Sequence, residues 1–137
     1  MVCGLWLGFD MILEGVIGPR GMIVEVIVVG PDGTARGEGM IDTGARTSCL
    51  DDAGMKKIGA KAISYEGRRT ICGNVDMPVV EAAVTIAGGP PDGLYYPKAR
   101  LMVGQNLGHL MLLGRDVLAL GTLHYDGAGK WFRFETP

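Results

Sequence analysis

The tripeptide Asp42-Thr43-Gly44 has the clearest chemistry in this chain. It directly follows the apolar pair Met40-Ile41 and precedes Ala45. An aspartate followed closely by glycine is common in turns, so a purely structural interpretation is available. However, a carboxylate that a glycine loop turns out from the end of a buried strand can also be held against an equivalent carboxylate. Two carboxylates so close share one proton, which provides the acid and the base that water-mediated peptide hydrolysis needs.

Other catalytic or metal-binding patterns are weaker. Neither serine, Ser48 nor Ser64, lies in a GxSxG motif. A cysteine–histidine dyad is possible by composition, but a free cysteine is more often a small buried apolar residue. The candidates for such a dyad are Cys49, Cys72, His109 and His124. Without CxxC, HExxH or GxxxxGK[ST], neither a zinc site nor a phosphate loop is predicted.

The segment before Asp42 has the pattern of a β-hairpin. Residues 22–30 are rich in β-branched side chains and predict a buried strand. Residues 31–34, Pro-Asp-Gly-Thr, predict a turn, and residues 35–41 the returning strand that ends directly before Asp42. Residues 11–17 predict an earlier strand that ends at Gly18-Pro19.

Downstream of Asp42, the chain alternates short apolar segments with turn residues. Residues 51–59 predict one helix, with an aspartate as N-cap, lysines in the last turn and Gly59 as a left-handed stop. The remaining expectations are strands at 66–75 and 78–86, a loop at 88–93, apolar runs at 99–103 and 110–113, a helix at 116–120, and a hairpin over 122–134 that turns at 126–129.

Composition narrows the class of protein. The 137 residues fit one domain, 47% are apolar, and 23 are glycines, which suggests the many tight turns of an all-β fold. A net charge of -2 without a basic block argues against nucleic acid, and apolar runs are too short to span a membrane. The start lacks the pattern of a signal peptide, and three cysteines without a CxxC pair suggest reduced thiols, so a cytoplasmic location is expected.

Two motifs together resemble the retroviral-type aspartic proteases, or retropepsins. Residues 41–45, IDTGA, look like their catalytic loop, and residues 112–118, LLGRDVL, look like their second signature. Order and spacing match, which is far more specific than either motif alone. Residues 121–127 resemble the end of bacterial retropepsin-like domains. The resemblance predicts a retropepsin-like domain over residues 11–137 and leaves 1–10 as an N-terminal extension of unknown role.

The resemblance implies an all-β closed barrel of the acid protease fold, with one or two short helices. Because DTG occurs once and two-lobed pepsin-like enzymes need more than twice this length, each active site requires Asp42 from both chains of a homodimer. The substrate would be an extended polypeptide that pairs as an added strand. Water is the nucleophile, and no metal or organic cofactor is implied.

The resemblance also assigns roles to residues. Asp42 would be catalytic, Thr43 would hydrogen-bond across the dimer axis, and the Gly44 backbone would accept substrate hydrogen bonds. The structural signature would be Leu113, Gly114, Arg115 and Asp116, with residues 112–114 crossing near the catalytic loop and Arg115 bracing it. Residues 66–76 would form a mobile, poorly packed flap over Asp42, with Gly67 and Gly73 as hinges. The substrate-binding candidates are Ala45, Arg46, Arg68, Arg69, Ile71 and Gly73.

Arg46 departs from the family pattern, because retroviral enzymes usually have an acidic residue there, paired with the signature arginine. We expect Arg46 to point away from Arg115 or to be separated from it by an acidic residue, and Arg115 to pair instead with Asp51, Asp52 or Asp116. The substitution keeps open a second hypothesis, a retropepsin-like dimerisation or peptide-binding module with little or no hydrolysis. A third, a monomeric β-barrel that binds a small ligand, does not account for the paired motifs.

Overall fold

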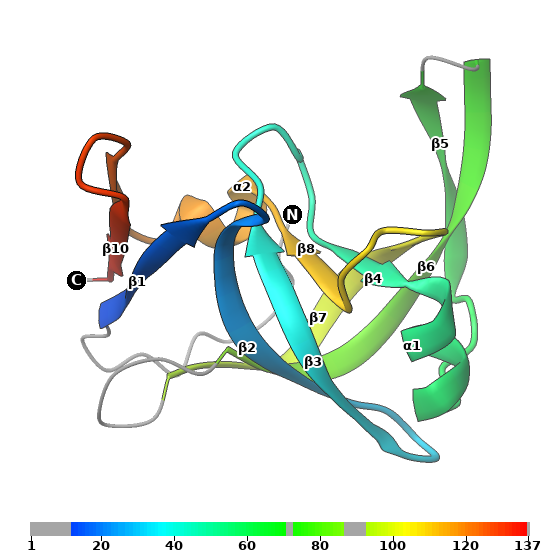
Figure 1. The fold of residues 1–137 in the computed structure, drawn as a ribbon. Helices are drawn as coiled ribbons and strands as arrows, with labels where there is room; N and C mark the ends of the chain where they lie inside the picture. Colours follow the sequence, from blue (N-terminus) through cyan, green and yellow to red (C-terminus); the bar gives the residue numbers. More distant parts are fainter. Residues whose placement is uncertain (1–11, 71–72, 87–92, 137) are drawn as a thin grey trace.

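The structure is a computed structural model, and it describes residues 12–70, 73–86 and 93–136. Strands dominate this part of the chain, with two short helices (Figure 1). The elements in order are β1 (Ile12–Gly18), β2 (Gly21–Val29), β3 (Thr34–Ile41), β4 (Cys49–Asp51), α1 (Asp52–Ile58), β5 (Ser64–Thr70), β6 (Gly73–Ile86), β7 (Leu94–Gly104), β8 (Met111–Leu113), α2 (Arg115–Leu118), β9 (Thr122–Asp126) and β10 (Trp131–Glu135).

The strands form one continuous sheet that returns upon itself. Its order is β5-β6-β7-β4-β8-β3-β2-β1-β10-β9, and β6 pairs additionally with β2. The pairings from β2 through β3, β8, β4, β7 and β6 therefore form a circuit that ends where it began. In this circuit, buried positions of β2 alternate with more accessible ones, and the side chains of Val26 and Val28 are completely buried.

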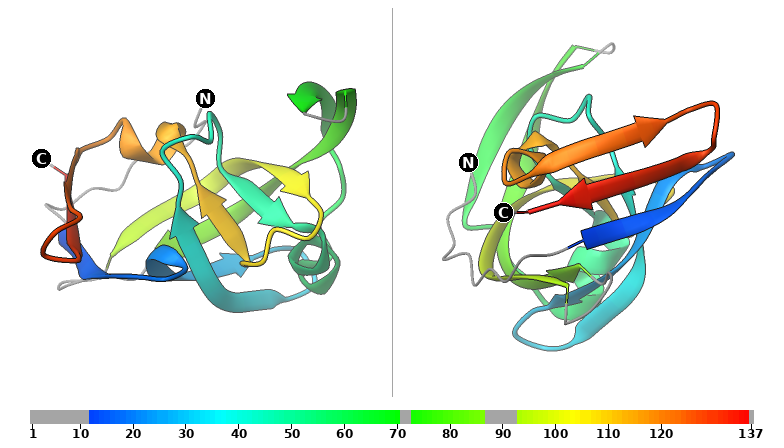
Figure 2. Two further views of the ribbon diagram at one scale, coloured as in Figure 1. Left: turned by 45° about the horizontal axis from the view of Figure 1, so that its top comes forward. Right: turned by 90° about the vertical axis from the view of Figure 1, so that its left-hand side faces the viewer.

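The chain ends form a three-stranded extension of this sheet. β1 pairs with β10 over residues 12–16 and then with β2 at Ile17 and Gly18, so it passes from one part of the sheet to the other. β9, β10 and β1 lie side by side in the right-hand view of Figure 2. Phe132 is buried there against Gly15, where an added Cβ would lie 2.8 Å from its ring. Glycine at position 15 thus makes room for the aromatic side chain.

The predicted helix at residues 51–59 and the first hairpin are confirmed. The Asp51 carboxylate accepts a hydrogen bond from the Ala53 amide, and Gly59 ends α1 with a φ of 69°. Lys56 pairs with Asp52 one turn earlier, at 3.1 Å. Contacts between residues that are close in the sequence therefore determine this helix.

The prediction of one strand over residues 66–75 is wrong. β5 ends at Thr70 and β6 begins at Gly73, so the segment belongs to two antiparallel strands, with Arg69 opposite Asn74. Gly73 has a φ of 112°, a conformation that glycine adopts readily. The β5–β6 hairpin rises beyond the rest of the molecule, on the side of the loop that follows β3 (Figure 1).

Smaller differences occur elsewhere. β7 extends well beyond the predicted run at 99–103, and α2 begins at Arg115 instead of residue 116. The last hairpin has its predicted place, with the Asp126 carboxylate accepting a hydrogen bond from the Gly129 amide at 2.7 Å. Of the predicted loop at 88–93, only Gly93 lies within the described residues. Neither of the two helices in the described ranges is long and apolar enough to span a membrane.

Candidate active site

Asp42 is the first residue after β3, and its loop is held by local hydrogen bonds. Asp42 Oδ1 accepts a hydrogen bond from the Gly44 amide at 2.9 Å, and the Asp42 carbonyl accepts one from the Ala45 amide at 3.1 Å. The preceding Ile41 is buried and anchors the end of the strand. The Asp42 side chain is half-buried, while Thr43 and Gly44 are exposed. The turn therefore presents a fixed carboxylate at the surface of the sheet.

The second motif lies directly beside this loop. β8 runs parallel to β3, with Ile41 opposite Leu113, and antiparallel to β4. The Asp42 amide donates to the Leu113 carbonyl at 2.9 Å. Gly114 follows at a close crossing of the two segments, because an added Cβ would lie 2.8 Å from the carbonyl oxygen of Ala45. Glycine is required there by space, since its φ of -93° is accessible to any residue.

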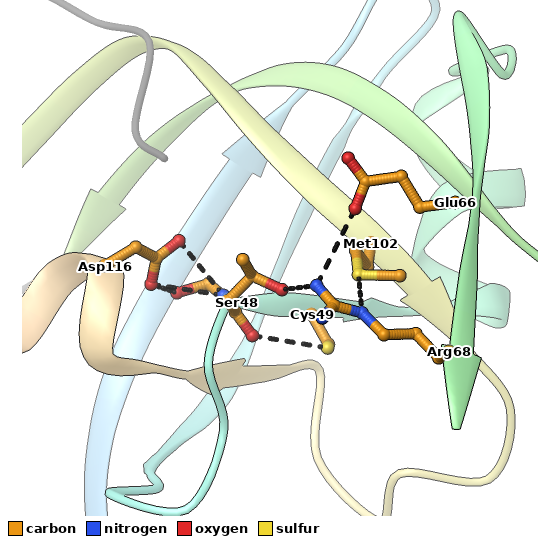
Figure 3. A network of polar contacts seen from close by, with 7 residues as sticks. Ser48, Cys49, Glu66, Arg68, Met102 and Asp116 are labelled. Carbon is orange, nitrogen blue, oxygen red and sulfur yellow. Dashed lines mark hydrogen bonds and ion pairs between the residues drawn. The ribbon is translucent and has the colours of Figure 1, made fainter. Parts of the chain in front are cut away.

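A partly buried hydrogen-bond network connects α2 to the Asp42 loop. Ser48 is 1% exposed, and its hydroxyl donates to Asp116 Oδ1 at 2.7 Å (Figure 3). The Ser48 amide also donates to both Asp116 carboxylate oxygens, at 3.1 and 3.0 Å, and Ser48 Oγ accepts from the Gly114 amide at 3.0 Å. Every polar group of this network is satisfied by a partner distant in the sequence.

The Arg115 side chain was expected to brace the Asp42 loop, but the α2 side chain that hydrogen-bonds to this loop is that of Asp116. The Arg115 side chain is exposed and has no hydrogen bond or ion pair within the described part of the chain; only its amide contacts the loop, donating to the Ala45 carbonyl at 2.8 Å. The three expected acidic partners are engaged elsewhere, because Asp51 caps α1, Asp52 pairs with Lys56, and Asp116 binds Ser48.

Ser48 was missed as a site residue. In the sequence Ser48 stands out only as a possible nucleophile, and nothing local marks it as buried. Asp116 in the second motif could have indicated such a residue, because a partly buried carboxylate needs hydrogen-bond donors from other parts of the chain. Only the pairing of β4 with β8 brings such a donor to it.

The β5–β6 hairpin contacts the loop through Arg68. Its guanidinium donates from Nη2 to Thr47 Oγ1 and from Nε to Met102 Sδ, both at 2.8 Å (Figure 3). Glu66 lies farther away, with Oε2 3.7 Å from Nη2. The hairpin predicted as a flap therefore reaches the segment that begins with Asp42.

Three further substrate-binding candidates within the described residues are not linked to one another by side-chain hydrogen bonds or ion pairs. Ala45 is half-buried, and Arg46 and Arg69 are exposed, without a side-chain hydrogen bond or ion pair to any residue described. Gly73 begins β6, and Ile71 lies outside the described residues. That Arg46 points away from Arg115 stays a prediction.

Cys49 lies among the charges of this site. Its thiol donates to the Thr47 carbonyl at 3.5 Å. Burial raises its pKa; the positive charge of Arg68 acts to lower that pKa, while the negative charges of Asp116 and Asp42 raise it further. Three charged residues from β5, α2 and the loop thus act on one thiol, so they belong to a single cluster.

The contacts in the described residues do not support a cysteine–histidine dyad or a metal site. His109 has Arg20 as its partner, with Nδ1 3.3 Å from a guanidinium nitrogen, whereas the Cys49 thiol contacts Thr47. Cys72 lies outside the described residues. In the ranges that the structure describes, no group of three or more His, Cys, Asp or Glu side chains is arranged to hold a metal ion.

The chain is similar in structure to a solved aspartic protease. The crystal structure of a retropepsin-like aspartic protease from Rickettsia conorii matches 96% of this chain and 96% of its own, with a TM-score of 0.63 and 16% sequence identity. No family model matches the sequence, and no curated protein matches it. At 16% identity the likeness concerns the fold. The chain therefore has a strand-dominated, retropepsin-like fold.

Proposed function

We propose that this protein is an aspartic endopeptidase that acts as a homodimer and has no metal or organic cofactor. The carrying observation is the Asp42 carboxylate, fixed by the Gly44 amide at the end of β3, in a loop locked by β8. The retropepsin-like fold supports the same assignment. The circuit of strand pairings supports the closed barrel that belongs to this proposal.

The proposed mechanism needs the Asp42 carboxylates of two chains. One, deprotonated, takes a proton from water, whose oxygen attacks the scissile carbonyl carbon. The other, protonated, donates its proton to the carbonyl oxygen. In the breakdown of the tetrahedral intermediate, the carboxyl that took the proton from water gives it to the amide nitrogen and the C–N bond breaks. The other carboxylate takes a proton from a hydroxyl of the intermediate, so an acid, an amine and the singly protonated pair result. Because activity needs the singly protonated pair, the rate should follow a bell-shaped pH profile with an acidic optimum.

A peptide-binding or dimerisation module without hydrolysis is the second candidate. Arg46 favours it, because this exposed cation occupies the position where the retroviral enzymes usually carry an acidic residue that contacts the substrate backbone. The two functions differ in one measurable property, the cleavage of peptide bonds.

The test is cleavage of a mixed peptide library between pH 3 and 8 by the wild type, Asp42→Asn and the control Asp52→Asn. Asp52 pairs with Lys56 on α1, so its substitution removes a carboxylate outside the Asp42 loop. We expect cleavage by the wild type and the control and none by Asp42→Asn, with sedimentation showing dimers of all three. Equal cleavage by wild type and Asp42→Asn would exclude the aspartic mechanism. No cleavage by any of them would favour the module.

Mixing the chains tests the shared site directly. A mixed dimer holds one Asp42 carboxylate and should be inactive. With a ninefold excess of Asp42→Asn and random exchange, activity per wild-type chain should fall about tenfold. Activity unaffected by the excess under exchange conditions would show that each chain has a complete site.

A further inference from the structure

The Arg68 guanidinium has no carboxylate within hydrogen-bond distance among the described residues. Its side chain is only 23% exposed, yet its two short contacts are to neutral acceptors, the Thr47 hydroxyl and the Met102 thioether. A thioether is a weak acceptor, and Nη1 has no partner within the described ranges. A partly buried cation is costly unless a carboxylate pairs with it.

The described carboxylate that forms an ion pair with Arg68 does not fill this role. Glu66 Oε2 lies 3.7 Å from Nη2, and the Glu66 side chain is 51% exposed. A pair of that length in contact with solvent contributes little and is easily displaced. An arginine can form a stronger ion pair than this one, because its planar guanidinium binds a carboxylate with two parallel hydrogen bonds.

Arg68 joins the two parts of the chain between which the proposed function places an extended peptide. It extends from the β5–β6 hairpin to Thr47, in the loop that begins with Asp42 (Figure 3). Arg68 and Asp42 also act on the same Cys49 thiol. A peptide held between the hairpin and this loop, as the proposed function requires, presents alternate side chains to opposite sides, and one of them faces Arg68.

From this arrangement we infer that Arg68 forms an acid-binding subsite, and that the substrates are polypeptides with an Asp or Glu side chain near the scissile bond. The inference rests on the proposed function. The substrate carboxylate takes the free Nη1 donor and replaces Met102 or Glu66 as the partner of the guanidinium. Arg68 is then a specificity-determining residue, and not merely a clamp between hairpin and loop.

The experiment compares peptides that differ only by Glu, Gln or Lys at single positions on either side of the bond. Cleavage is measured with the active protein, and binding by fluorescence anisotropy in the Asp42→Asn variant. The variants are Arg68→Gln, Arg68→Lys and Arg68→Glu. Arg36→Gln is the matched control, because Arg36 is exposed on β3 and forms no hydrogen bond or ion pair with a described residue.

At one position we expect Glu to be preferred over Gln by about tenfold, in kcat/KM and in affinity. Arg68→Gln should abolish this preference for Glu, and Arg68→Lys should retain part of it. Arg68→Glu should instead prefer the Lys peptide, and Arg36→Gln should keep the wild-type preference. A purely structural clamp predicts instead that Arg68→Gln weakens all peptides equally and keeps the preference for Glu.

The outcomes separate the two proposals. An absent Glu preference, or one that Arg68→Gln retains, overturns the acid-binding subsite whether or not peptides are cleaved. A Glu preference in binding that Arg68→Gln abolishes, without cleavage by the wild type, supports the subsite and overturns the protease. Neither binding nor cleavage of any peptide overturns both.

Discussion

The hydroxyl of Ser48 donates a 2.7 Å hydrogen bond to Asp116, a residue 68 positions later in the chain. This contact joins the loop that carries Asp42 to the start of α2. Gly114 belongs to the same network, because its amide donates to the Ser48 hydroxyl. The candidate catalytic carboxylate is therefore positioned by a residue that has no catalytic chemistry of its own.

Ser48→Ala should lower the free energy of unfolding by about 1–3 kcal/mol, because the Gly114 amide and an Asp116 oxygen would each lose a buried partner. Urea unfolding measures this loss. Ser64→Ala is the control, since the buried Ser64 hydroxyl has no hydrogen-bond partner among the described residues. If both variants lose the same stability, the Ser48–Asp116 network does not stabilise the fold.

Gly114→Ala should be destabilising by about 1–3 kcal/mol and should reduce peptide cleavage, because a Cβ there lies 2.8 Å from the Ala45 carbonyl oxygen and from the Thr47 backbone. Gly18→Ala is the matched control, since its Cβ would meet nothing within 4 Å. Thermal unfolding and the cleavage assay check the pair. Equal melting temperatures for the two variants would contradict the close crossing of the segments.

Alkylation of Cys49 should reveal the charge of Arg68. Burial raises the thiol pKa, so at pH 8.5 Cys49 should react with iodoacetamide more slowly than a free thiol; Cys3 and Cys72 are replaced by serine to isolate it. Arg68 acts to lower that pKa, so Arg68→Gln should raise it further and slow the reaction again, whereas Arg36→Gln should not. A faster reaction of Arg68→Gln would mean that Arg68 controls access to the thiol instead of its charge.

The stability of the fold should decline in alkaline solution through Tyr96. Burial, and then the charge of Asp116, raise the pKa of this phenol far above its ordinary value of 10. The unfolded chain therefore releases its proton from about pH 10, while the folded chain retains it. The free energy of unfolding therefore decreases as the pH rises above about 10.

Tyr96→Phe should make this decline shallower in urea unfolding between pH 8 and 11. Tyr125→Phe serves as the control, because Tyr125 is 61% exposed. If the two variants show the same pH dependence as the wild type, the buried phenol does not govern the alkaline limit.

The sequence by itself determined the elements whose hydrogen bonds are local. The turn between β2 and β3, the caps of α1 at Asp51 and Gly59, and the last hairpin follow from residues within a few positions of one another. The two motifs around Asp42 and Gly114 were also recognisable, because their residue types and order carry the resemblance. The resemblance also pointed to the fold, which the Rickettsia conorii protease shares.

Only the tertiary structure decided which distant groups meet. Nothing local indicated that β1 changes partner from β10 to β2, or that residues 66–75 belong to two strands. The replacement of the Arg115 brace by Asp116 also depends on a donor from another part of the chain. A hydrogen bond needs its partner within about 3 Å. For Ser48 and Arg68 that partner is supplied by strand pairing between segments far apart in the sequence, which no local pattern encodes.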